Sequence, residues 1–291
     1  MFEKKDDKVV LVFSVLITAF LILGFYYEFF TIIALIISVF LCVFLKPSKF
    51  SVILIYLLPW AYVFKLSFFT TSLYVILYII ASLIFFFKSK KHNILFILLL
   101  LIFSAYLLIP VSNTDKYIFV IKLIFAIFLL YYMIKLFDYK DKYLLLVMFI
   151  FSVVLCSITG LIYADSSILA NRINIEGSTI EATYVRFTGL SNDPNYYNLN
   201  VVFALFATMF LFLKNKIKFL FYPLFVLLFF FGTLTYSKSF LLLFIILLCY
   251  LIYFLFRARK KYTIISILIL LLLMCFLIIN GKIENVNVII G

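Results

Sequence analysis

Residues 186–198 read RFTGLSNDPNYYN and form the most polar stretch of a chain that is otherwise largely apolar. The stretch offers one arginine, one carboxylate and three amides, and it runs directly into an apolar segment. A guanidinium binds phosphate oxygens in a bidentate fork, and amides offer donors and acceptors to hydroxyl-rich ligands. These residue types therefore favour a site for an anionic, hydroxylated ligand at the mouth of a helix.

The helix that follows this stretch has a clear start signal. Asp193 suits the N-cap position, and Pro194 suits the first helical position, where its missing N–H costs nothing. The free N–H groups and the positive dipole end of this helix form a candidate anion site, to which Arg186 can add its fork. Asn195 and Asn198 are three residues apart and can share one face of the first turn. The structural alternative is a well-capped helix with a solvated loop before it.

A second polar stretch, TLTYSKS at residues 233–239, follows one helical hairpin later. Lys238 adds a point charge that can contact a second phosphate, and Ser237 is one of the hydroxyls around it. The alternative is a polar turn with a snorkelling lysine. Arg172 is a further candidate for binding the ligand, with a solvated loop side chain as its alternative.

The composition indicates that helices in a membrane position these stretches. Hydrophobic residues make up 68% of the 291 and charged residues 13%, whereas a soluble domain carries roughly a quarter charged residues. We therefore predict an all-α, polytopic bundle that forms a single integral-membrane domain over residues 1–291. A net charge of +13 would fit nucleic acid, but the basic residues fall between the apolar segments. They follow membrane topology, so no nucleic-acid partner is expected.

The apolar runs predict about eleven spans, since a helix needs about 20 residues to cross the hydrocarbon. The runs at 9–45 and 51–87 are each too long for one span. Gly24 and Glu28 divide the first, and the second is broken near residues 65–71, with a kink at Pro59. Single spans are predicted at about 93–111, 117–137, 143–163, 196–213, 219–234, 240–256 and 262–279.

The lysines and arginines set the orientation of these spans. With a cytoplasmic N-terminus every inner loop is basic, as the positive-inside rule requires. The longest segment outside the spans, at about 164–195, then lies on the outer face together with both polar stretches. A single histidine, His92, and four scattered cysteines give no basis for a metal site. With no phosphate-binding loop or dinucleotide fingerprint either, no cofactor is expected.

Together the two stretches resemble the O-antigen ligase and polymerase (Wzy/WaaL-like) superfamily. Its members carry an R-x-x-G-x-x-x-x-P-N-like element entering one span and a T-x-S-R-like element at the outer end of a nearby one. Here these elements read RFTGLSNDPN and TYSK. Predicted helix number, orientation and loop placement also agree, so the resemblance covers most of the chain.

The resemblance implies a GT-C-like bundle in the bacterial cytoplasmic membrane and a metal-independent glycosyltransferase. Such an enzyme polymerises or ligates polyprenyl diphosphate-linked oligosaccharides on the outer face, for capsule, O-antigen or exopolysaccharide. Arg186 takes the place of the first arginine of the family and Lys238 that of the second, where lysine keeps the charge but loses the planar fork. Asp193 and Glu181 are candidates for deprotonating the acceptor hydroxyl, since the outer-loop histidine of the family has no counterpart. A flippase and a chain-length regulator are implied partners.

A lipid-linked oligosaccharide flippase or a polysaccharide transporter is the main alternative. Transporters tend to carry charged groups near the membrane midplane, whereas the charges here cluster at the ends of the spans. Eleven spans also leave residues 280–291 on the outer side, where the resembling families continue with a large loop and further spans. We therefore expect the protein to continue beyond Gly291, with a shorter protein or a miscounted helix as the alternative.

Overall fold

The computed structural model describes residues 5–66, 71–108, 114–163, 187–191, 193–217, 219–235 and 237–257, and positions 265 and 267. Within these ranges the protein is helical and contains no strand. Arg172, Glu181 and Arg186 lie outside the described residues, as does almost all of the span predicted at 262–279.

Ten α-helices and two short 3-10 helices follow one another in the described chain. The α-helices are α1 (Lys5–Leu23), α2 (Glu28–Phe44), α3 (Pro47–Leu57), α4 (Leu73–Lys88), α5 (Ile94–Leu108), α6 (Thr114–Leu136), α7 (Lys142–Ile162), α9 (Pro194–Leu213), α10 (Phe221–Leu234) and α11 (Lys238–Arg257). The 3-10 helices are η1 (Leu58–Trp60) and η2 (Tyr139–Asp141).

Both predicted divisions of the long apolar runs are confirmed. Helix α1 ends at Leu23, directly before Gly24, and α2 begins at Glu28. The second run changes to the 3-10 helix η1 around Pro59, because proline removes a hydrogen bond of the α-helix. Helix α3 begins at Pro47, earlier than the predicted start at residue 51, since this proline suits the first helical turn.

Four described helices, α6, α7, α9 and α11, are long and apolar enough to cross a membrane, by length and composition. Four further apolar helices, α2, α4, α5 and α10, are shorter. Large apolar side chains cover their surfaces, and Ile102 and Phe206 are examples of exposed ones. This arrangement is compatible with a membrane protein, while the count of eleven spans, their orientation and the GT-C-like architecture stay predictions.

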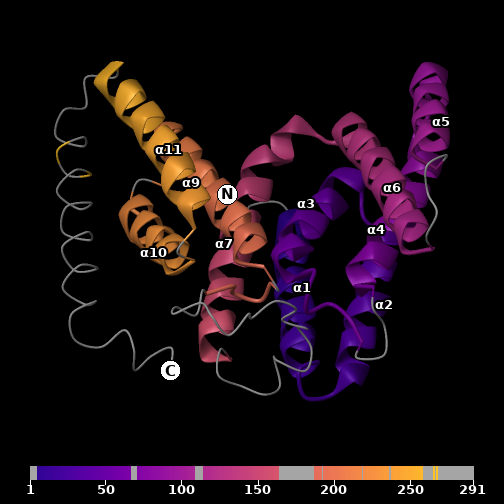
Figure 1. The fold of residues 1–291 in the computed structure, drawn as a ribbon, viewed down its shortest axis with the longest axis horizontal. Coiled ribbons are helices and arrows are strands. Elements are labelled where there is room, and N and C mark those ends of the chain that lie inside the picture. Colours follow the sequence, from indigo (N-terminus) through magenta and orange to yellow (C-terminus); the bar gives the residue numbers. More distant parts are fainter. Residues whose placement is uncertain are drawn as a thin grey trace.

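Helix α7 lies in the middle of the bundle (Figure 1). Helices α9, α10 and α11 lie on one side of it, and α1 to α6 lie on the other. Each side has its own apolar core, and α7 contributes to both: Met148 belongs to the first core and Phe149 to the second. Polar contacts fix α7 against the first side, since the indole N–H of Trp60 donates to the Ser152 hydroxyl at 3.2 Å.

One end of the bundle is rich in lysine, and we call it the lysine-rich end. Its lysines are Lys46, Lys49, Lys88, Lys135, Lys142, Lys214 and Lys216. Contacts between neighbouring segments place these residues together. Lys88 donates hydrogen bonds to three carbonyl oxygens at the end of α2, and Lys135 donates to the carbonyl oxygen of Lys91. Lys216 lies over the ring of Tyr143 at the start of α7. The opposite end, which we call the motif end, comprises Asp193, Asn195, Asn198, Ser237 and Lys238.

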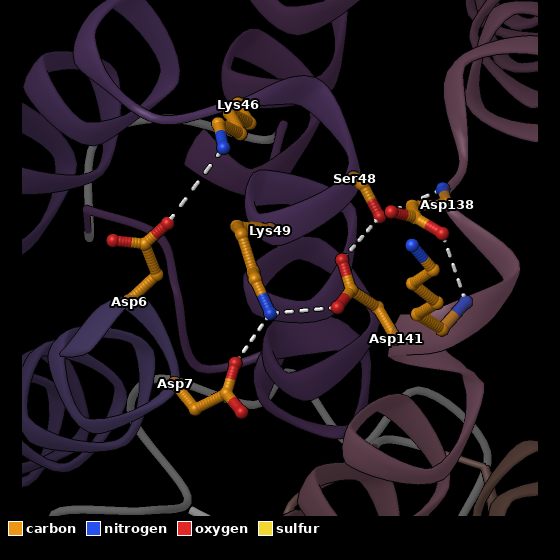
Figure 2. A network of polar contacts seen from close by, with 8 residues as sticks. Asp6, Asp7, Lys46, Ser48, Lys49, Asp138 and Asp141 are labelled. Atoms are coloured by element: carbon orange, nitrogen blue, oxygen red, sulfur yellow. Dashed lines mark hydrogen bonds and ion pairs between the residues drawn. The ribbon is translucent and has the colours of Figure 1, made fainter. Parts of the chain in front are cut away.

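A buried ion-pair network joins three helix starts at the lysine-rich end (Figure 2). The Lys49 ammonium on α3 donates to the carboxylate of Asp7 on α1, and to Asp141 before α7 at 2.7 Å. Ser48 donates to the second carboxylate oxygen of Asp141 at 2.6 Å and accepts from the Asp138 backbone N–H at 2.9 Å. The side chains of Lys49, Asp7 and Asp141 are only 8%, 10% and 11% exposed. The network therefore fixes α1, α3 and α7 to one another.

Candidate functional site

The start of α9 matches the prediction from sequence. Asp193 is the N-cap in an extended conformation, and its carboxylate accepts the backbone N–H of Asn195 at 2.6 Å. Pro194 occupies the first helical position. The cap fixes the point at which the polar side chains of α9 enter the bundle, and it occupies one carboxylate oxygen of Asp193.

The segment just before this cap is packed among the helices, although the sequence predicted a loop there. Leu190 is fully buried, and Ser191 is 1% exposed. The backbone N–H of Phe187 donates to the carbonyl oxygen of Leu234, at the end of α10, at 3.1 Å. The Phe187 ring meets that of Tyr197 edge-on at 5.3 Å. Residues 187–191 therefore link α9 to the end of α10.

Gly189 makes this close packing possible. Its φ is +59°, and a side chain there would meet the ring of Tyr197 at 2.5 Å. On the other side, a Cβ on Gly160 of α7 would lie 2.8 Å from the Gly189 backbone. The Tyr197 ring is itself held, since its hydroxyl donates to Ser157 of α7 at 2.6 Å. The glycine of the first motif is thus required by its backbone conformation and by its neighbours.

The second motif forms the tight turn between α10 and α11. Thr235 is fully buried, and its hydroxyl donates to the carbonyl oxygen of Gly232 at 2.7 Å. Gly232 lies directly against the ring of Phe240, where a side chain would not fit. This packing directs Ser237 and the start of α11 toward the start of α9.

The two motifs meet in a cluster of two amides and two hydroxyls, which we call the amide–hydroxyl cluster: Asn195, Asn198, Ser237 and Ser239. The amide nitrogen of Asn198 donates to Ser239 at 3.1 Å and to Ser237 at 3.4 Å. Ser237 donates to the amide oxygen of Asn195 at 3.4 Å, and the two serine hydroxyls are 2.6 Å apart. Asn195 and Asn198 therefore share a face of α9, as predicted, and that face contacts the start of α11.

One atom of the cluster is left without a partner in the described part of the protein. Asn198 is 1% exposed, and its amide oxygen is buried without a hydrogen bond. An unsatisfied buried polar group costs about 1–3 kcal/mol. The cluster thus keeps a hydrogen-bonding group that its own side chains do not satisfy.

Lys238 is the first residue of α11 and is exposed beside the cluster. It makes no hydrogen bond or ion pair with another described residue. A positive charge at a helix N-terminus is unfavourable, because the dipole end is also positive. Since α9 and α11 both begin here, two positive dipole ends lie at the motif end, together with one ammonium that has no partner in the described part of the chain.

Two tyrosines lie beside the cap of α9. The rings of Tyr62, in the turn after η1, and Tyr196 are 6.2 Å apart between centroids. Burial raises the pKa of the Tyr62 phenol, and the neighbouring Tyr196 and Asp193 raise it further. Tyr62 therefore stays protonated near neutral pH and can donate a hydrogen bond beside the Asp193 carboxylate.

The structure brings five of the seven predicted site residues to one place: Asp193, Asn195, Asn198, Ser237 and Lys238. The other two, Arg172 and Arg186, lie outside the described residues. The sequence placed Ser239 among the hydroxyls around Lys238 without selecting it as a site residue, and it did not indicate Tyr62. Tyr62 gives no sequence signal, because its proximity depends on how η1 packs against α7 and α9.

No group of three or more His, Cys, Asp or Glu side chains in the described ranges is arranged to hold a metal ion. His92 lies at the lysine-rich end, where its Nδ1 is 3.0 Å from the Tyr132 hydroxyl.

Comparison with protein-family models, with curated proteins and with solved structures finds no match to this chain. What the motif end can do chemically is therefore inferred from its own side chains alone.

Proposed function

We propose that the protein is a membrane glycosyltransferase that transfers an oligosaccharide from a polyprenyl diphosphate donor at its motif end. The product is a longer polysaccharide if the acceptor is another lipid-linked repeat unit, which makes the protein a polymerase of the O-antigen type. Transfer to a different acceptor makes it a ligase. The GT-C-like architecture and the bacterial cytoplasmic membrane belong to this proposal.

The Lys238 charge at the start of α11, which has no ion-pair partner among the described residues, carries the proposal. As the bond to the sugar C1 breaks, negative charge grows on the leaving diphosphate. The Lys238 ammonium and the N-termini of α9 and α11 stabilise that charge. Because the charge grows toward the transition state, these groups lower the barrier rather than only binding the donor.

The other groups of the motif end have roles in binding and proton transfer. The amide–hydroxyl cluster supplies donors and acceptors of the kind that sugar hydroxyls require. Asp193 uses one carboxylate oxygen for its cap, and the other accepts the proton of the acceptor hydroxyl. Arg186 directly precedes Phe187, whose backbone N–H donates a hydrogen bond to the carbonyl oxygen of Leu234 at the end of α10. We propose that its guanidinium joins Lys238 on the diphosphate.

Incubation of the purified protein with its lipid-linked oligosaccharide tests the proposal. The substrate is extracted from source cells that lack this gene, and the products are separated by length on gels. Chain lengthening is expected of the polymerase. Movement of the lipid across a vesicle membrane without new glycosidic bonds would replace the proposal with a flippase.

Variants at Lys238 and Arg186 test the assigned roles. Lys238→Met is expected to lower the rate at least tenfold, because the charge on the leaving group loses a cation. Lys238→Arg keeps the charge and is expected to remain active.

Arg186→Lys is expected to lose most activity, because the bidentate fork is lost. Lys90→Met removes an exposed lysine two residues after Lys88 and serves as the control. Equal rates in all four variants would contradict the roles given to Lys238 and Arg186.

A further inference from the structure

Most of the lysines at the lysine-rich end have protein partners, but three differ from the rest. Lys49 is paired with two aspartates, and Lys88 with three carbonyl oxygens. The side chains of Lys142, Lys214 and Lys216 form no ion pair with any described carboxylate. Their neighbours are aromatic rings instead.

These three lysines converge from two segments that are far apart in sequence. Lys142 begins α7, and its ammonium lies 3.4 Å from the ring centroid of Tyr139 and 5.0 Å from that of Tyr143. Lys216 lies 5.0 Å from the same Tyr143 centroid. Two ammonium groups therefore lie close to one ring, and Lys214 adds a third charge from the same turn as Lys216.

The turn that carries Lys214 and Lys216 is fixed by its backbone. Asn215 adopts a left-handed conformation with φ +56°. The N–H of Asn215 donates to the Phe212 carbonyl at 2.9 Å, and the N–H of Lys216 donates to the Leu211 carbonyl at 2.9 Å. This pair of bonds is the Schellman motif that ends many helices. The two lysines are thus presented at fixed positions of the bundle end.

Apolar side chains are exposed close to the three lysines. Phe219 is 94% exposed and Leu220 is 60% exposed, and they follow Lys216 by three and four residues. Tyr139 is 72% exposed next to Lys142. Aromatic and basic side chains together are typical of the level at which membrane headgroups meet the acyl chains.

We propose that Lys142, Lys214 and Lys216, with Phe219, form a binding site for the headgroup of an anionic phospholipid. The three ammonium groups contact the headgroup phosphate, and Phe219 enters the acyl region beside it. The positive charge of the three lysines favours an anionic lipid over a zwitterionic lipid, whose headgroup carries no net charge. The site lies at the opposite end of the bundle from the proposed glycosyl transfer, and it depends on the placement of the protein in a membrane but not on its enzymatic activity.

Lipid binding by the full chain tests this site directly. The protein is purified in detergent and titrated with cardiolipin, phosphatidylglycerol or phosphatidylcholine, and the retained lipids are counted by native mass spectrometry. A lysine near an anionic headgroup strengthens binding roughly fivefold. The triple variant Lys142→Gln, Lys214→Gln and Lys216→Gln is therefore expected to weaken cardiolipin binding at least about tenfold, with phosphatidylcholine binding unchanged.

A matched variant removes the same charge elsewhere on the same end. Lys8, Lys90 and Lys91 are exposed, and their joint replacement by Gln is expected to change cardiolipin binding less than about twofold. Phe219→Ser is expected to weaken lipid binding, whereas it would not affect binding of inorganic phosphate at the lysines. Equal losses in the two triple variants would overturn the proposal, because the lipids would then respond to net charge alone. Phosphate binding without lipid selectivity would overturn it as well.

Discussion

The two ends of the bundle are held together by different chemistry. At the lysine-rich end, Lys49 is buried between Asp7 and Asp141, so each charge has a partner within the protein. At the motif end, the contacts between α9 and α11 are made by neutral amides and hydroxyls. The charge beside them, Lys238, has no partner among the described residues.

This difference separates groups that stabilise the fold from groups that are available to a ligand. The Lys49 ammonium is buried between two carboxylates and is therefore not available to a ligand. The motif end instead has two helix N-termini, and within the described ranges the Lys238 cation and the buried amide oxygen of Asn198 have no partner. Substitutions in the Lys49 network should therefore change stability, and substitutions in the amide–hydroxyl cluster or at Lys238 should mainly change activity.

The largest expected effect is the loss of Lys49. Lys49→Met leaves two buried carboxylates without a cation, which costs about 3–5 kcal/mol of unfolding free energy. Unfolding of the purified protein in detergent, followed by circular dichroism, measures this cost. Lys46→Met is the matched control, because that side chain is 81% exposed and 4.0 Å from Asp6. It should cost no more than about 1 kcal/mol.

Adding Asp7→Asn and Asp141→Asn to Lys49→Met sharpens the comparison. The triple variant carries no buried charge in the network and should regain much of the lost stability. A triple variant less stable than Lys49→Met alone would show that the carboxylates stabilise the fold through partners other than Lys49.

A smaller loss is expected at Gly189 of the motif end. Gly189→Ala places a side chain at φ +59° and against the Tyr197 ring, at a cost of about 1–3 kcal/mol. Gly189→Asn separates the two causes, because asparagine adopts left-handed conformations more readily than alanine does. If Asn is tolerated as well as Gly, the contact with the ring is unimportant. The measurement is again unfolding in detergent.

Asn198→Leu should have little effect on stability and a large one on function. The substitution removes the hydrogen bonds to Ser237 and Ser239, but it also removes a buried oxygen without a partner. These effects oppose each other, so the unfolding free energy should change by less than about 1 kcal/mol. Chain lengthening should fall at least tenfold, because the amide–hydroxyl cluster binds sugar hydroxyls in the proposed reaction. Full activity in this variant would exclude the amide–hydroxyl cluster from the substrate site.

The smallest expected effect on stability is at Lys238, and it has the opposite sign. Lys238→Met removes a positive charge from the N-terminus of α11 and should raise the unfolding free energy by about 0.3–1 kcal/mol. The same variant is expected to lower the rate of chain lengthening at least tenfold. Reduced stability together with normal activity would assign Lys238 a structural role and contradict the comparison between the two ends.

Local features of the site could be predicted from sequence, whereas contacts between distant segments could not. The cap by Asp193 and the position of Pro194 depend only on adjacent residues, and both predictions were confirmed. The contact of Asn198 with Ser239 joins residues 41 positions apart, and it requires the packing of Phe240 against Gly232. The residue types suggested that both motifs serve one site, but they did not predict which side chains contact one another there.

Lys49 shows the limit of reasoning from composition. The sequence places it among the inner-loop lysines that follow the positive-inside rule, which predicts a solvated side chain. The structure buries it instead, because the starts of α1 and α7 each bring an aspartate to α3. A sequence pattern does not reveal this, since it depends on the packing of three separate helices.

The contact between Gly160 and Gly189 has a consequence for the length of the chain between them. These glycines flank the segment at residues 164–186, and they meet at one point of the bundle. The described residues at the two ends of this segment are therefore held together by that contact, whatever the number of residues between them. Doubling the length of a closed segment costs only about 0.6 kcal/mol. Insertions between residues 164 and 185 should thus cost little stability while α7 and α9 keep their positions, provided that Arg186 of the proposed site is retained.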